Sequence, residues 1–114
     1  MIRKISLLGL SIVVAGCTTM SQGEYNTAQT ALAGSPSLKR EIMASCVKDE
    51  NARSAKDKAE MAAVFNINPA NYAQTFCKRM INGMASNRIT YQDYRNLDST
   101  TADNSKLIRV LQGR

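Results

Sequence analysis

The sequence predicts an all-α protein, a small bundle of three to four helices over residues 36–114 that is cross-linked by one disulfide and preceded by a flexible, lipidated tether. Two observations favour this fold class. Apolar side chains recur at helical spacing in several segments, and residues typical of helix N-caps precede those segments. In addition, Cys46 and Cys77 lie on two of the apolar stripes, where the packing of two helices would bring them together.

The first segment, residues 1–16, has the pattern of a secretory signal. Arg3 and Lys4 precede an uncharged run, ISLLGLSIVVA, which gives the charged start and apolar middle of such a signal. The run is shorter than the roughly 20 residues that a membrane-spanning helix needs. We therefore expect residues 1–16 to be cleaved from the mature protein.

The end of this signal, Val14-Ala15-Gly16-Cys17, resembles the lipobox of bacterial lipoproteins. The resemblance implies that Cys17 becomes the first residue of the mature chain, carries a lipid on its sulfur and receives a further acyl chain, such as palmitate, on its amino group. In that family an Asp after the cysteine tends to retain the protein at the inner membrane, whereas this chain has Thr18. The implied location is the outer membrane, facing the periplasm. An ordinary secreted protein with a free thiol at its cleavage site is the alternative.

Residues 17–35 are expected to form the flexible, lipidated tether. The stretch TTMSQGEYNTAQTALAGS is polar, low in large apolar side chains and without sustained periodicity, so it buries too little surface to offset its ordering entropy. A chain of this kind has an r.m.s. reach of roughly 20 to 25 Å. Residues 27–33 are expected to form at most a transient helical turn.

The next segment predicts one helix from about residue 37 and a second over about residues 54–65. Ser37 and Ser54 are the expected N-caps. The first helix has an apolar stripe made by Leu38, Ile42 and Cys46, with Met43 and Val47 beside them. The second is expected to bury Met61, Val64 and Phe65. The stripe fails across DENARS, which favours a break near residue 51. One continuous helix over residues 38–65 is the alternative, because neither Gly nor Pro interrupts the segment.

The third helix has the clearest pattern in the chain. Asn68 can cap it, and Pro69 suits its first turn. Its apolar stripe contains Tyr72, Phe76, Met80 and Met84, flanked by Cys77 and Ile81. The opposite side contains Lys78, Arg79, Asn82 and Ser86. A short fourth helix would begin at Thr90, with Asp93 three residues later as in a capping box. Residues 99–105 read as a loop, and residues 107–111 as a last turn that docks or frays.

The two cysteines of the helical part are expected to pair. A chain exported past the inner membrane meets an oxidising compartment, and Cys46 and Cys77 lie on apolar stripes that must pack together. The sequence has neither a Cys-x-x-Cys motif nor a set of four closely spaced zinc ligands. Two buried free thiols are the alternative.

Composition argues against catalysis and nucleic-acid binding. The chain has no His, which removes the commonest general base, and it has no phosphate-binding glycine motif. We predict no catalytic residues, no cofactor and no metal site. Removal of residues 1–16 takes away two of the fifteen cations and lowers the formal net charge from +6 to +4. No basic run exceeds two residues, so we expect no nucleic-acid partner.

Two functional classes fit these features. The first is a non-enzymatic binding or scaffold protein of the cell envelope, held to membrane lipid by its acylated N-terminal cysteine and contacting an envelope protein. The second is a periplasmic inhibitor or immunity-type lipoprotein, with a small subunit of a secretion or conjugation machine as a further alternative. The expected partner surface mixes cations with aromatic rings and contains Arg88, Tyr91, Tyr94 and Arg95. The alternative for the rings is a place in the core.

Overall fold

The computed structural model describes residues 20–97 and 99–114. The predicted signal (residues 1–16) and the predicted lipid-attachment residue, Cys17, lie outside the described residues. In the described part the chain is helical and has no strand, which confirms the predicted all-α class. Its elements are α2 (Gln22–Gly34), α3 (Pro36–Asn51), α4 (Ala55–Val64), the short 3-10 helix η1 (Pro69–Asn71), α5 (Tyr72–Ala85), α6 (Tyr91–Asn96) and α7 (Ser105–Leu111).

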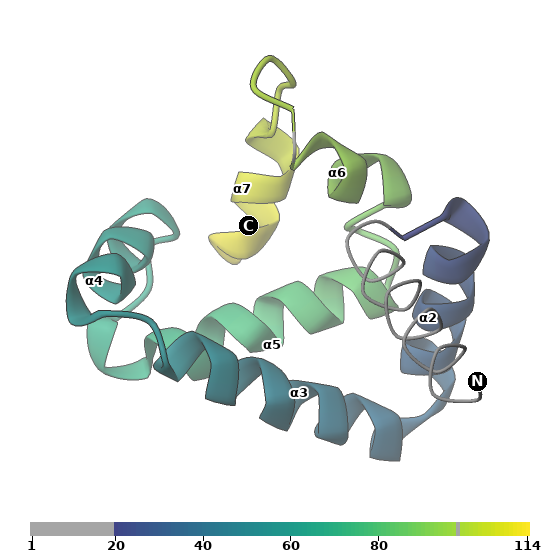
Figure 1. Cartoon of the computed structure of the whole chain (residues 1–114), viewed down its shortest axis with the longest axis horizontal. Coiled ribbons are helices and arrows are strands. Elements are labelled where there is room, and N and C mark those ends of the chain that lie inside the picture. Colours follow the sequence, from purple (N-terminus) through teal and green to yellow (C-terminus); the bar gives the residue numbers. More distant parts are fainter. Residues whose placement is uncertain (1–19, 98) are drawn as a thin grey trace, which may run out of the picture.

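Helix α5 is the centre of the structure. Helices α2, α3, α4 and α7 all contact it. Figure 1 shows α3 running alongside α5, with α2 near one end of the pair and α4 near the other. The buried residues of α5 are Tyr72, Ala73, Phe76, Cys77, Ile81 and Gly83. Of the predicted stripe, Tyr72 and Phe76 are buried, and Met80 and Met84 are partly buried against the same core.

The segment predicted as either one or two helices forms two, α3 and α4. The N–H of Ala52 donates to the carbonyls of Lys48 and Asp49, which ends α3. The Ser54 hydroxyl then accepts from the N–H of Asp57 and caps α4. The DENARS sequence therefore breaks the helix without Gly or Pro, because the Ser54 cap satisfies one of the free N–H groups at the start of the new helix.

The prediction of a flexible tether over residues 17–35 is wrong for residues 22–34, which form α2. Ser21 and Glu24 make a capping box at the start of α2. Leu32 on this helix is buried in the core, where α2 packs against α3 and α5. Tyr25 is buried beside the rings of Tyr91 and Tyr94 on α6. A weakly amphipathic segment is thus ordered by a few large side chains that contact distant parts of the chain.

The C-terminal part adds two short helices. Thr90 and Asp93 form the predicted capping box at the start of α6. Helix α7 docks through buried Leu107, Val110 and Leu111. Together with α2, these helices bring the described part to six α-helices, more than the predicted three to four. No helix among the described residues combines the length and apolar character that crossing a bilayer requires.

Candidate functional site

A disulfide fixes α3 to α5 and so sets one wall of the candidate site. The sulfur atoms of Cys46 and Cys77 are bonded, and their Cα atoms are 5.9 Å apart, which confirms the predicted pairing. Cys77 is fully buried, whereas α3 contributes no fully buried residue. Met43 and Val47 of α3 pack against the core while partly exposed. The position of α3 therefore depends strongly on the disulfide.

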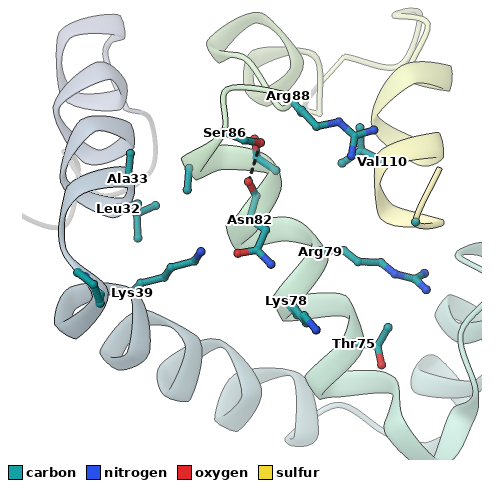
Figure 2. Close-up of a pocket in the computed structure, with 14 residues that line it drawn as sticks. Leu32, Ala33, Lys39, Thr75, Lys78, Arg79, Asn82, Ser86, Arg88 and Val110 are labelled. Atoms are coloured by element: carbon teal, nitrogen blue, oxygen red, sulfur yellow. Dashed lines mark hydrogen bonds between the residues drawn. The ribbon is translucent and has the colours of Figure 1, made fainter.

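The candidate site is a groove of about 820 Å³ over the outer side of α5. Its walls come from the corner between α2 and α3 on one side and from α7 on the other, as Figure 2 shows. Four cations line it, and no Asp or Glu is among the described residues that line it. These cations are Lys39, Lys78, Arg79 and Arg88.

The cationic character continues beyond the groove on both sides. A neighbouring depression along α3 and α5 adds Arg40, and one beside α7 adds Lys106, Arg109 and Arg114. No Asp or Glu is among the described residues that line either depression. Lys106 is ion-paired with Asp93 at 2.9 Å, but no Asp or Glu is among the described residues that line the groove itself. Cations gathered there create a positive potential, so the groove favours an anionic ligand.

Two of the groove cations are available for a ligand. Lys39 extends from α3 over the groove toward Asn82 of α5 (Figure 2). Lys78 lies one helical turn before Asn82 and is exposed. Neither ammonium group makes a hydrogen bond or an ion pair with another described residue. We define Lys39 and Lys78 as the lysine pair of the groove.

Arg79, in contrast, has a structural role. Its guanidinium donates to the carbonyl oxygens of Phe65, at 3.2 Å, and Leu111, at 2.9 Å. These carbonyls belong to the C-terminal ends of α4 and α7, where the helix dipole favours a positive charge. Gly113 has a φ of +81°, and a Cβ on it would lie 3.0 Å from the Arg79 Cζ. A glycine here lets the chain turn closely over the guanidinium.

Gly83 sets how closely the helices approach behind the groove. A Cβ on Gly83 would lie 2.7 Å from the Cδ1 of Ile89 and 3.1 Å from the Cγ1 of Val110. The contact with Ile89 is closer than real Cβ atoms approach, and the contact with Val110 is tighter than most of them. Gly83 therefore allows Ile89 and α7 to pack directly against the α5 backbone, which places α7 at the edge of the groove.

The structure separates the four residues of the predicted partner surface. Arg88 lines the groove, and its guanidinium donates to the carbonyl of Arg114. Tyr91, Tyr94 and Arg95 lie on α6, where the Arg95 guanidinium donates to the Tyr91 hydroxyl at 3.2 Å. A partner surface that contains these four residues stays a prediction.

Tyr91 and Tyr94 hold the start of the described chain. The Tyr91 hydroxyl donates to the carbonyl of Met20, and the Tyr94 hydroxyl accepts from the N–H of Met20, each at 3.0 Å. We call these two residues the tyrosine clamp. The ring of Tyr25 lies 5.6 Å from that of Tyr91 and 5.7 Å from that of Tyr94.

Two further bonds dock α2 on the segment between α5 and α6. The buried Tyr25 hydroxyl donates to the carbonyl of Ile89, and the Gln29 side-chain amide donates to the carbonyl of Ala85 at 2.8 Å. Burial, with a smaller contribution from the Asp93 carboxylate, raises the pKa of Tyr25. The Tyr25 hydroxyl therefore stays protonated and able to donate at neutral pH.

The groove itself is not among the sites predicted from the sequence. Its signal is present, because Lys78, Arg79, Asn82 and Ser86 were recognised as the polar side of α5. The polar side of a helix is usually only solvated, and nothing in the sequence of α5 itself indicates that α2 and α7 border it. Among the described residues, no group of three or more His, Cys, Asp or Glu side chains is placed to hold a metal ion.

Comparison of the chain with protein-family models, with curated proteins and with solved structures finds no match.

Proposed function

We propose that this chain is a lipid-anchored, non-enzymatic binding protein of the bacterial cell envelope, and that the groove over α5 binds an anionic group of its partner. The anchor is the acylated Cys17 implied by the lipobox resemblance, and the expected location is the outer membrane, facing the periplasm. Two or three acyl chains hold a protein on a membrane in practical terms permanently. The partner is then another component of the same envelope.

The observation that carries the proposal is the composition of the groove. It has four cations and, among the described lining residues, no carboxylate. The guanidinium of Arg79 donates its hydrogen bonds to carbonyls at helix ends. The lysine pair, Lys39 and Lys78, is therefore the part of the groove that contacts a ligand. Flexible ammonium groups contact carboxylates or phosphates as point charges, without the fixed fork geometry of arginine. An acidic protein surface of the envelope fits such a site.

The lipidated linker in this proposal is shorter than a tether of residues 17–35. Residues 22–34 belong to the folded part as α2, so the link from Cys17 to the folded part spans only a few residues. The groove is consequently held near the membrane surface. A short link of this kind suits a partner that is also membrane-associated.

The anchor is tested by replacing Cys17 with Ser. We expect the native protein in the membrane pellet and the Cys17→Ser protein in the soluble periplasmic fraction. A Cys17→Ser protein that still sediments with membranes would contradict lipid anchoring.

The groove is tested by site-specific photo-cross-linking in intact cells. A photoreactive side chain at Asn82 faces the groove, and one at the exposed Ala59 of α4 is the matched control. We expect a discrete adduct from position 82 that weakens as the salt concentration rises, because salt screens exposed charges. The same adducts from both positions would argue against the groove as the binding site.

A further inference from the structure

The tyrosine clamp fixes the point at which the chain leaves the described part toward Cys17. Both backbone polar groups of Met20 are bonded to the clamp. The clamp rings are supported from behind by the fully buried ring of Tyr25. Because Tyr91 and Tyr94 belong to α6, the start of the folded chain is held against a helix that is more than 70 residues away in sequence.

Chain length then limits how far α6 can lie from the lipid. Met20 is three residue steps from Cys17, with two residues between them. At roughly 3.3 to 3.6 Å per residue, this stretch spans at most about 10 Å. If Cys17 carries the lipid, as the proposed function states, its sulfur is held at the membrane surface, and the clamp keeps α6 close to the same surface.

The exposed chemistry of α6 suits a membrane surface. Arg95 is exposed beside the ring of Tyr91, and Leu97, at the end of α6, is 52% exposed. A cation is attracted to an anionic bilayer, and tyrosine suits the boundary between headgroups and water. The one carboxylate of α6, Asp93, is engaged by Lys106 at 2.9 Å. Its charge is therefore compensated on the protein side.

We propose that α6 is the membrane-facing surface of the protein, and that the tyrosine clamp sets this orientation. The occupant of the surface is the anionic lipid bilayer that holds the Cys17 lipid. This inference rests on the proposed lipid anchor and goes beyond it, since an anchor alone would let the folded part rotate freely. The clamp converts a flexible attachment into a preferred orientation.

The test measures the depth of tryptophan probes in membrane-bound protein. The chain has no Trp, so Leu97→Trp on α6 and Val64→Trp on α4 each supply a single probe. The two native side chains have nearly equal exposure, 52% and 53%, and Figure 1 shows α4 and α6 on opposite sides of the molecule. The lipidated proteins are reconstituted into vesicles of phosphatidylethanolamine and phosphatidylglycerol that contain brominated acyl chains.

We expect the brominated lipids to quench the Leu97→Trp protein several-fold more than the Val64→Trp protein. Adding Tyr91→Phe and Tyr94→Phe removes both hydroxyls that hold Met20 but keeps the rings, and should bring the two quenching values close together. Equal quenching before this change would overturn the orientation. Unequal quenching that survives it would overturn the role of the clamp. Flotation of the vesicles distinguishes failure of the anchor: lipidated protein that does not float with vesicles overturns the proposed anchor and the orientation together.

Discussion

Loss of the Cys46–Cys77 disulfide is the perturbation whose size can be worked out most directly. The bond joins residues 31 apart in sequence. In the chain-entropy model, opening a loop of that length lowers the free energy of unfolding by about 3.7 kcal/mol at 25 °C. Small domains have total stabilities of about 5 to 15 kcal/mol. We therefore expect the reduced protein to lose a quarter or more of its stability.

The structure also predicts where this loss appears. Helix α3 has no fully buried residue, so its attachment to α5 depends on the disulfide and on partly exposed contacts such as those of Met43 and Val47. Reduction should loosen α3 before it unfolds α5. Because Lys39 lies on α3 and lines the groove, we also expect reduction to weaken binding of the anionic partner.

The assay is urea unfolding followed by far-ultraviolet circular dichroism, with the Cys17→Ser protein as a soluble background. Three samples are compared: the oxidised protein, the reduced protein and the Cys46→Ala/Cys77→Ala variant. The first two separate the effect of the cross-link from the loss of buried side-chain atoms. Hydrogen exchange should show α3 amides losing protection first. If reduction lowers the free energy of unfolding by less than about 1 kcal/mol, the loop-entropy estimate is refuted. If all helices lose hydrogen-exchange protection equally, the dependence of α3 on the disulfide is refuted.

Three further changes test the packing around the groove. Gly83→Ala places a methyl group 2.7 Å from Ile89 and should lower the free energy of unfolding by about 1 to 3 kcal/mol. Urea unfolding measures this change. An unchanged unfolding midpoint would contradict the close approach of Ile89 to Gly83. Arg79→Gln removes charged hydrogen bonds at the ends of α4 and α7 and should lower the free energy of unfolding by about 2 kcal/mol. Thermal unfolding measures this change. A change within about 0.5 kcal/mol, as at an ordinary surface site, would show that these hydrogen bonds contribute little to stability. Burial, together with the hydrogen bond to Glu50, raises the pKa of Tyr72 above its usual 10.0. Above pH 10.0 the Tyr72 hydroxyl therefore loses its proton in the unfolded chain before it does so in the folded one, and the free energy of unfolding should fall as the pH rises. Urea unfolding below and above that pH should show a smaller fall for Tyr72→Phe than for the native protein. An equal fall in the two proteins would contradict the raised pKa.

Local signals were sufficient to predict the helices that carry their own caps and stripes. Helix α5 has a full apolar stripe, and the capping box at Thr90 and Asp93 begins α6 as predicted. The expected export to an oxidising compartment and the two cysteine-containing stripes predicted the disulfide that the structure has. In these cases the deciding interactions lie within one helix or between two cysteines on neighbouring helices.

Helix α2 could not be predicted in this way, because distant contacts stabilise it. Of its residues, Tyr25 and Leu32 are buried, and Gln29 bonds to the end of α5. The Ser21 and Glu24 capping box is a local signal that could have been recognised. In the predicted stripe of α3, Met43, Cys46 and Val47 pack on the core, whereas Ile42 is 37% exposed.

The groove could not be predicted for the same reason, because it is formed by helices that are far apart in the sequence. Its floor is the polar side of α5, which the sequence identifies, but its walls come from α2, α3 and α7. Whether a polar side becomes a groove depends on how those helices dock. That docking depends on Gly83, Arg79 and Tyr25, each of which acts through contacts with residues far away in sequence.

The most direct test of an anionic partner in the groove is cross-linking capture from intact cells that express the native lipoprotein. Lys39→Gln/Lys78→Gln removes the lysine pair, and Lys48→Gln/Lys56→Gln removes the same charge from exposed positions outside the groove. We predict one stoichiometric envelope partner, with an acidic contact surface, that is captured by the native protein and the control variant and lost from the groove variant. Capture that is unchanged in the groove variant, or equally reduced in both variants, would contradict binding through the groove.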